Sequence, residues 1–92
     1  MGERRSASAG KAQKGDVLVT IHDVCGPLRL TLTSSVQGLF GTQMEAVCRQ
    51  VLQEIGVVSG QIVVDDQQAL DCVLRSRIRC AVQRLRQQGG SL

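Results

Sequence analysis

The sequence predicts an α+β fold, a two-layer sandwich in which two helices cover one face of a three-stranded sheet. Two segments alternate apolar and polar residues, as strands with one buried face do, and a third is a short β-branched run. Two other segments repeat apolar residues at steps of three and four, the period of an amphipathic helix. The elements follow in the order ββαβα, and packing both helices on one face of the sheet buries all of these apolar faces together.

The first two strands are expected to form a hairpin. Residues 16–22 and residues 28–33 alternate apolar with polar side chains, and the second segment does so most regularly, with leucine at every other position. Residues 23–27, between them, contain a Gly-Pro pair, which is typical of a turn. We therefore expect the two strands to pair with each other, while the order of strands in the sheet stays open.

The first helix is expected to follow Thr42 and to stop at Gly56, after a glycine-punctuated connection over residues 36–41. Thr42 and Glu45 have the spacing of a capping box, in which each side chain accepts a hydrogen bond from the other residue's amide. Glycine commonly stands just past the end of a helix. The apolar stripe of this helix consists of Met44, Val47, Cys48, Val51, Leu52 and Ile55.

The third strand and the second helix are predicted to meet at a pair of acids. Residues 62–64 form the β-branched run, which Asp65 and Asp66 end. Asp65 and Gln68 have the spacing of a helix start, because a carboxylate accepts hydrogen bonds from the free amides of the first turn and is favoured at that end of the helix dipole. We therefore assign both acids to a helix cap. The apolar stripe beyond them consists of Leu70, Val73, Leu74, Ile78, Ala81 and Leu85.

The length of the chain indicates one domain. Ninety-two residues bury only a modest core, which favours a module of a larger assembly over an enzyme with a cleft of its own. Residues 1–14 are small, polar and cationic, so we expect a flexible N-terminal arm, followed by the α+β domain over residues 15–88 and a short tail at residues 89–92. No apolar run approaches the roughly 18 residues of a membrane span, and no secretory signal is visible, which predicts a cytoplasmic protein.

Neither a catalytic residue nor a metal site is predicted. The cysteines have no Cys-x-x-Cys spacing, and the single histidine, His22, has no partner fixed by spacing. The thiols are therefore expected to be reduced and mostly packed, as in other cytosolic proteins. The cysteines are Cys25, Cys48, Cys72 and Cys80.

The second helix carries a cationic side. Arg75, Arg79 and Arg86 lie at steps of four and seven, so they project together and could dock on an acidic partner subunit. They could also meet the phosphates of RNA. RNA-binding proteins normally add aromatic side chains on which bases stack, and Phe40 is the only aromatic residue here. Docking on a partner is therefore the stronger interpretation, and a small RNA-binding protein is the weaker alternative.

The stretch VVDDQQALDCVLRSR, residues 63–77, resembles the C-terminal half of the citrate lyase acyl carrier protein (gamma chain) family, with VDD and ALDC.LR as the most specific part. Other matches lie upstream in the same order. They are the Ala9-Gly10 pair, the strand start Gly15-Asp16-Val17, the segment Leu32-Thr33-Ser34-Ser35-Val36 and the segment Leu39-Phe40-Gly41.

This resemblance implies a non-catalytic carrier. Members of the family hold an acyl group as a thioester on a phosphoribosyl-dephospho-coenzyme A arm, which a prosthetic-group transferase links through phosphate to a serine. The alpha subunit of citrate lyase exchanges acetyl for citrate on the arm, and the beta subunit cleaves the citryl carrier to oxaloacetate and acetyl carrier. The implied partners are these two subunits and the transferase. A tether makes each transfer effectively intramolecular, so a small rigid body with one attachment point is enough.

The attachment position departs from the family pattern. Aligned from Ala9-Gly10 to Asp16-Val17, the family's modified serine falls at Lys14, and a lysine side chain cannot form a serine phosphodiester. Ser8 and Ser6 are the substitute candidates that lie nearby. Two interpretations stay open at this point: the attachment has moved, or the chain is an unmodified carrier relative that serves as an interaction or scaffold subunit.

Overall fold

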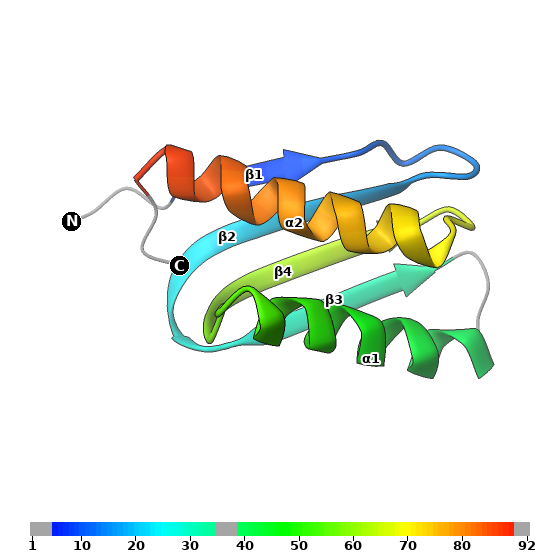
Figure 1. Cartoon of the computed structure of the whole chain (residues 1–92), viewed down its shortest axis with the longest axis horizontal. Helices are drawn as coiled ribbons and strands as arrows, with labels where there is room; N and C mark the ends of the chain where they lie inside the picture. The colour runs from blue at the N-terminus through cyan, green and yellow to red at the C-terminus, as the bar shows by residue number, and fades with distance from the viewer. Residues whose placement is uncertain (1–4, 35–38, 90–92) are drawn as a thin grey trace.

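The computed structural model describes residues 5–34 and 39–89. The strands form one sheet, and the two helices lie on the same face of it (Figure 1). The fold is therefore α+β, with one layer of helices over one layer of strands, as predicted. In chain order the elements are β1 (Ser6–Ala9), β2 (Val17–Pro27), β3 (Arg29–Ser34), α1 (Leu39–Glu54), β4 (Ser59–Asp66) and α2 (Asp71–Gln87).

The strand order in the sheet is β1-β2-β4-β3. β2 pairs with β1 and with β4 in antiparallel fashion, whereas β3 and β4 are parallel, because α1 carries the chain back to the end of the sheet where β3 began. β4 therefore separates β2 from β3, and the predicted hairpin between residues 16–22 and 28–33 is wrong. The turn predicted over residues 23–27 is wrong as well, since β2 continues to Pro27 with a change of register after His22.

The fourth strand, β1, comes from the segment expected to be a flexible arm. Ser6–Ala9 pairs along its whole length with β2, and Ala7 and Ala9 are buried beneath α2. The prediction of a flexible arm over residues 1–14 is therefore wrong for this strand, and the observed order is βββαβα in place of ββαβα. Alanine is only weakly apolar, so its alternation with serine gave little sign of a buried face.

Three hydrogen bonds hold β1 in place beyond its pairing in the sheet. The carbonyl of Arg5 accepts a bond from the amide of Asp23 at 2.8 Å. The guanidinium of Arg5 donates to the carbonyl of Gln88 at 2.6 Å, and that of Arg84 donates to the carbonyl of Ser8 at 2.7 Å. Residues at the C-terminal end of α2 thus hold the edge strand β1 in place. Arg84 also occupies the carbonyl of Ser8, with which another strand could otherwise pair.

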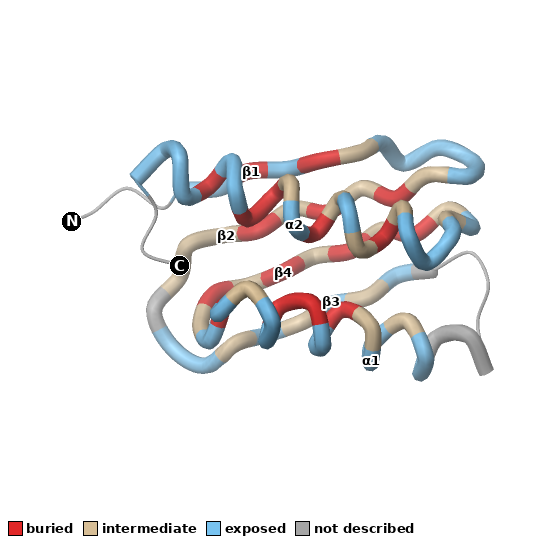
Figure 2. Tube along the Cα trace, in the orientation of Figure 1, coloured by how far each residue is buried: buried red, intermediate tan, exposed pale blue. Residues whose placement is uncertain are grey.

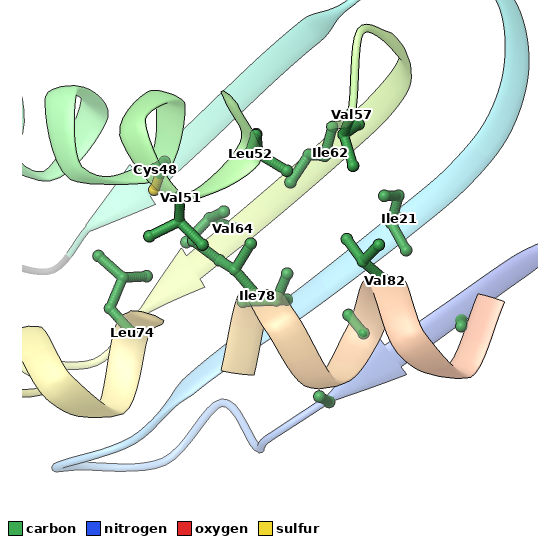
Figure 3. Close-up of a cluster of buried hydrophobic side chains, with 14 of the residues drawn as sticks. Ile21, Cys48, Val51, Leu52, Val57, Ile62, Val64, Leu74, Ile78 and Val82 are labelled. Atoms are coloured by element: carbon green, nitrogen blue, oxygen red, sulfur yellow. The ribbon is translucent and has the colours of Figure 1, made fainter. Parts of the chain in front are cut away.

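The core lies between the helices and the sheet. Buried residues alternate along β1, β2 and β4 and follow one stripe on each helix, whereas half-buried leucines alternate along β3 (Figure 2). Leu74, Ile78 and Val82 project from α2 into the same cluster as Val51 of α1 and Val64 of β4 (Figure 3). The predicted stripes of both helices are confirmed in their middle and C-terminal parts.

The start of α1 differs from the prediction. The helix begins at Leu39, so Thr42 lies inside it and the capping box with Glu45 is wrong. Part of the predicted connection over residues 36–41 is therefore helical, and the rest of it lies outside the described residues. The end is as expected, because Gly56 follows the helix with a φ of 78°, a conformation that glycine adopts without strain.

The two acids after β4 do not cap α2 as predicted. The helix begins at Asp71, with Leu70 at the N-cap position and no side-chain cap, and Leu70 is 70% exposed instead of joining the core stripe. Asp66, only 2% exposed, instead stabilises the connecting turn by accepting hydrogen bonds from the amides of Gln68 and Ala69. Asp65 lies on the other face of β4 and accepts a bond from the side chain of Gln67 at 2.9 Å.

Replacing Asp66 with alanine is expected to lower the free energy of unfolding by about 1–3 kcal/mol, because two backbone amides of a partly buried turn lose their acceptor. The same change at Asp65 should cost less than about 0.5 kcal/mol, as at other partly exposed positions. Chemical denaturation of the two variants measures both values. An equal loss in the two would show that the acids share the turn and would contradict this assignment.

Within the described residues, neither helix is long and apolar enough to cross a membrane.

Candidate functional site

The candidate site is the loop between β1 and β2, residues 10–16, which will be called the β1–β2 loop. It projects at the end of the sheet where α2 begins (Figure 1). The amide of Asp16 donates to the carbonyl of Gln13 at 2.9 Å, which closes a turn with Lys14 and Gly15 as its two central residues. Gly15 has a φ of 83°, as the third residue of a type II turn does. Lys14, which the resemblance aligns with the family's modified serine, therefore lies at the outer corner of a turn and is exposed.

An ion pair anchors the end of this loop to α2. Arg77 donates from Nε to Asp16 Oδ1 at 3.1 Å and from Nη2 to Asp16 Oδ2 at 3.3 Å, in a two-pronged arrangement. Asp16 Oδ1 also accepts a bond from the amide of Val17 at 2.7 Å. The carboxylate of Asp16 is only 15% exposed, so the pair is shielded more than an ordinary surface ion pair.

Backbone contacts fix the loop on its other sides. The amide of Gly15 donates to the carbonyl of Gln67 at 2.7 Å, and the amide of Gln67 donates to the carbonyl of Asp16 at 3.0 Å. At the start of the loop, Gly10 has a φ of 86° and lies so close to the carbonyl of Val17 that there is no space for a Cβ atom. The loop is thus an exposed turn whose ends are held by the Gln67 backbone bonds, the Asp16–Arg77 pair and the close packing of Gly10. These contacts are called the fixed base of the loop.

The pKa of Asp16 is lowered from its ordinary value of 3.8 by the hydrogen bond from the Val17 amide and then by the Arg77 guanidinium. Because the folded pKa lies below the unfolded one, the ionised carboxylate stabilises the fold above the ordinary value, and this contribution is lost as the pH falls through the lowered pKa. The stability difference between wild type and Asp16→Asn should therefore be constant above pH 3.8 and shrink below it.

Urea midpoints measured for both proteins from neutral pH down to about pH 2 test this pH dependence. A difference that stays the same throughout the acid range would mean that Asp16 acts through something other than its charge.

A pocket of about 560 Å³ opens between the N-terminal halves of α1 and α2. Its apolar wall includes Met44, Val47 and Leu74, and the connection after β4 closes one side with Asp66 and Gln68. Gln68 directly follows the residue that pairs with the backbone of the loop, so pocket and loop tip share one end of the molecule.

The substitute attachment residues, Ser6 and Ser8, are exposed but lie in β1. They alternate with the buried alanines, so their side chains face away from the helices. Both belong to a strand whose backbone is paired with β2, a setting quite different from the turn that holds Lys14. The structure therefore places neither serine in the loop.

The arginines predicted to form a docking face all make internal contacts. Arg75 pairs with Asp71 at 2.8 Å, Arg79 pairs with Glu54 of α1 at 3.3 Å, and Arg86 donates to the carbonyl of Ile55 at 2.7 Å. The contacts of Arg79 and Arg86 join α2 to the C-terminal end of α1, whereas the pair of Arg75 with Asp71 lies within α2. Because all three guanidinium groups already have partners, these contacts disfavour the RNA-binding alternative. Docking of the exposed parts of these residues on another subunit stays a prediction.

Three of the cysteines are described as free thiols, at positions 48, 72 and 80. In the part of the chain that the structure describes, no group of three or more histidine, cysteine or acidic residues could hold a metal ion. Cys48 is buried, and burial raises the pKa of its thiol to about 11, which keeps it protonated and inert. Cys72 is exposed and Cys80 half-buried, and both are free.

Sequence reasoning missed the groups that fix the loop. The sequence pattern assigns no role to Arg77, whose pairing with Asp16 joins residues far apart in the chain. Periodicity gives no information about such a contact. The one available signal was Gly10, because glycine is the residue that suits tight turns and close backbone approaches.

A small α+β domain presents the β1–β2 loop as an exposed turn on a fixed base. These are the features of a carrier or docking module. The family model described as malonate decarboxylase delta subunit (MdcD) matches residues 4–85. The chain belongs to this family of acyl carrier proteins. No solved structure matches it.

Curated relatives support the same assignment. The citrate lyase acyl carrier protein of Pectobacterium atrosepticum is 40% identical over 80 residues, which are 87% of this chain and 83% of that protein. The protein of the same name from Klebsiella pneumoniae subsp. pneumoniae is 41% identical over 83 residues, covering 89% and 86% of the two chains. The Haemophilus influenzae (strain PittGG) protein, again of this name, is 40% identical over 78 residues, covering 85% and 81%. The resemblance seen in the sequence is therefore confirmed.

Proposed function

We propose that this chain is the acyl carrier subunit of a cytoplasmic citrate-lyase-type complex, in which it docks on the alpha and beta subunits and does no bond-making chemistry itself. The observation that carries the proposal is the exposed β1–β2 loop on its fixed base, at the position where the family attaches its arm. Identity of about 40% to proteins named citrate lyase acyl carrier protein supports this choice of complex.

The family implies a covalent phosphoribosyl-dephospho-coenzyme A arm, and the residue in this loop does not fit it. The geometry is suitable, because position 14 lies at the outer corner of an exposed turn. The chemistry is not, because Lys14 offers an ammonium group where the linkage needs a hydroxyl oxygen. Ser8 and Ser6 have that oxygen, but they lie in a paired strand and not at a turn.

Lys14 favours a second candidate function, an unmodified subunit that binds the partner enzymes as a scaffold. Both candidates share docking on the lyase subunits and differ only in the covalent arm. A carrier would present acyl groups to the alpha and beta subunits in turn, whereas a scaffold would fill the same place in the complex without presenting a substrate.

Docking is tested by co-expressing the tagged chain with citrate lyase alpha and beta subunits and measuring co-purification by size-exclusion chromatography with light scattering. We expect a complex that contains all three chains. The Klebsiella pneumoniae carrier serves as the positive control. If the control assembles and this chain does not, the proposal of a citrate-lyase-type subunit fails, and malonate decarboxylase subunits become the next partners to try.

A further inference from the structure

We infer that the β1–β2 loop already has the backbone geometry of an attachment site and lacks only the hydroxyl oxygen that would accept the prosthetic arm. The wild-type chain takes no arm there, and Lys14→Ser alone makes the loop a substrate for the prosthetic-group transferase. This inference rests on the part of the proposed function that the carrier and the scaffold share, because it requires a relative that the lyase subunits and the transferase can recognise. Of the two candidates, it selects the unmodified scaffold for the wild-type chain. It goes further by naming the one residue that decides modification.

The base of the loop does not depend on the side chain at position 14. The turn is closed by the Asp16 amide and the Gln13 carbonyl, and its far side is bonded to Gln67. Arg77 holds Asp16 through two bonds to α2. All of these contacts use atoms of other residues, and Lys14 itself is exposed. A serine at this position therefore inherits the same backbone, and serine is a residue that turns accept well.

The chemistry of the linkage explains why the lysine blocks it. In Lys14→Ser, the Ser Oγ atom forms a new P–O bond to the arm. With a triphosphate-activated donor, the bond from that phosphorus to pyrophosphate breaks, pyrophosphate leaves, and the hydroxyl proton passes to solvent. The lysine has no oxygen to form this ester, and its ammonium group has no lone pair with which to attack phosphorus. The loop therefore presents an exposed turn at the aligned position but no nucleophilic oxygen.

The test is intact mass spectrometry of the full chain after incubation with a citrate lyase prosthetic-group transferase and its triphosphate-activated donor. Wild type, Lys14→Ser and Lys14→Ala are compared, with the Klebsiella pneumoniae carrier as positive control and circular dichroism as a check of folding. We expect one adduct on Lys14→Ser, mapped to position 14 by fragmentation, and none on wild type or Lys14→Ala.

Two further variants test whether the fixed base matters. Combining Lys14→Ser with Arg77→Ala should slow modification on the order of tenfold or more. Without Arg77, Asp16 is no longer held against α2, so the hydroxyl at position 14 is no longer kept in one position. The matched control combines Lys14→Ser with Arg49→Ala. Arg49 forms an exposed pair with Glu45 on α1, so the control should be modified at the rate of Lys14→Ser. Equal rates in all three would overturn the claim that the base is preformed.

The possible failures are distinguishable. An adduct on Ser8 or Ser6 of wild type overturns the inference, since the attachment has then moved, and leaves the proposed function intact. Absence of an adduct from Lys14→Ser, with the positive control modified and docking on the lyase subunits intact, also overturns only the inference. If docking fails as well, the proposed function is wrong.

Discussion

Replacing Leu74 with alanine is expected to lower the free energy of unfolding by about 2–5 kcal/mol. Leu74 is 2% exposed and projects from α2 into the cluster that joins both helices to the sheet (Figure 3). Removal of its side chain loses the transfer free energy of the buried methyl groups and leaves a cavity that the packed neighbours fill only in part. Denaturation with urea, monitored by circular dichroism, measures the loss.

Leu70→Ala is the matched control for this change. The residue is also a leucine of the predicted apolar stripe, one helical turn earlier, but it is 70% exposed. Its replacement should change the free energy of unfolding by less than about 0.5 kcal/mol. Similar losses at Leu74 and Leu70 would mean that α2 begins earlier or is rotated, and would contradict the boundary at Asp71.

Replacing Gly10 with alanine is the second change with a large expected effect. Gly10 has a φ of 86°, which costs an ordinary residue about 1–2 kcal/mol. Its Cβ would also overlap the carbonyl oxygen of Val17 and lie 3.1 Å from Cδ of Arg77. Overpacking of this kind costs typically about 1–3 kcal/mol more and forces the loop away from its anchor.

Gly15→Ala separates the two contributions. Gly15 has nearly the same φ, 83°, but no atom lies within 4 Å of the site of its Cβ. It should therefore show only the backbone cost of about 1–2 kcal/mol. The difference between the two variants, measured by chemical denaturation, is the cost of the steric overlap. Equal losses would show that the start of the loop is free to move and that its base is not fixed.

The parts of the fold that follow from periodicity could be predicted. Of the predicted strand segments, residues 17–22, 29–33 and 62–64 are in strands, and the stripe from Leu74 to Leu85 is buried. Alternation and helical spacing report directly on which side chains face the core. Element boundaries were less accurate, since an acid such as Asp66 can stabilise a turn before a helix as readily as the helix itself.

Sheet topology required reasoning that local patterns do not supply. Adjacent strands often form hairpins, and that expectation produced the wrong pairing of β2 with β3. A 16-residue helix between β3 and β4 is, however, the connection that parallel strands need, so the sequence did contain a signal for their pairing. β1 was missed because its buried residues, Ala7 and Ala9, have too little apolar surface to distinguish a strand from a polar arm.

The candidate site was predicted in part. Lys14 was found through the family resemblance, which gives a position in the sequence. The ion pair that anchors the loop was not found, because Arg77 and Asp16 are 61 residues apart in the chain. Arg75, Arg79 and Arg86 were singled out for their shared side of α2. The structure shows that Arg79 and Arg86 contact Glu54 and the carbonyl of Ile55 at the end of α1, which helical spacing alone cannot reveal.

Hydrogen exchange of the backbone amides in residues 10–16, with and without bound citrate lyase alpha and beta subunits, tests most directly that the β1–β2 loop is the part presented to the partners. We expect exchange there to slow on binding, by more than in the solvent-facing half of α1 around Glu45 and Arg49. A complex that forms while exchange at residues 10–16 stays the same would contradict the account.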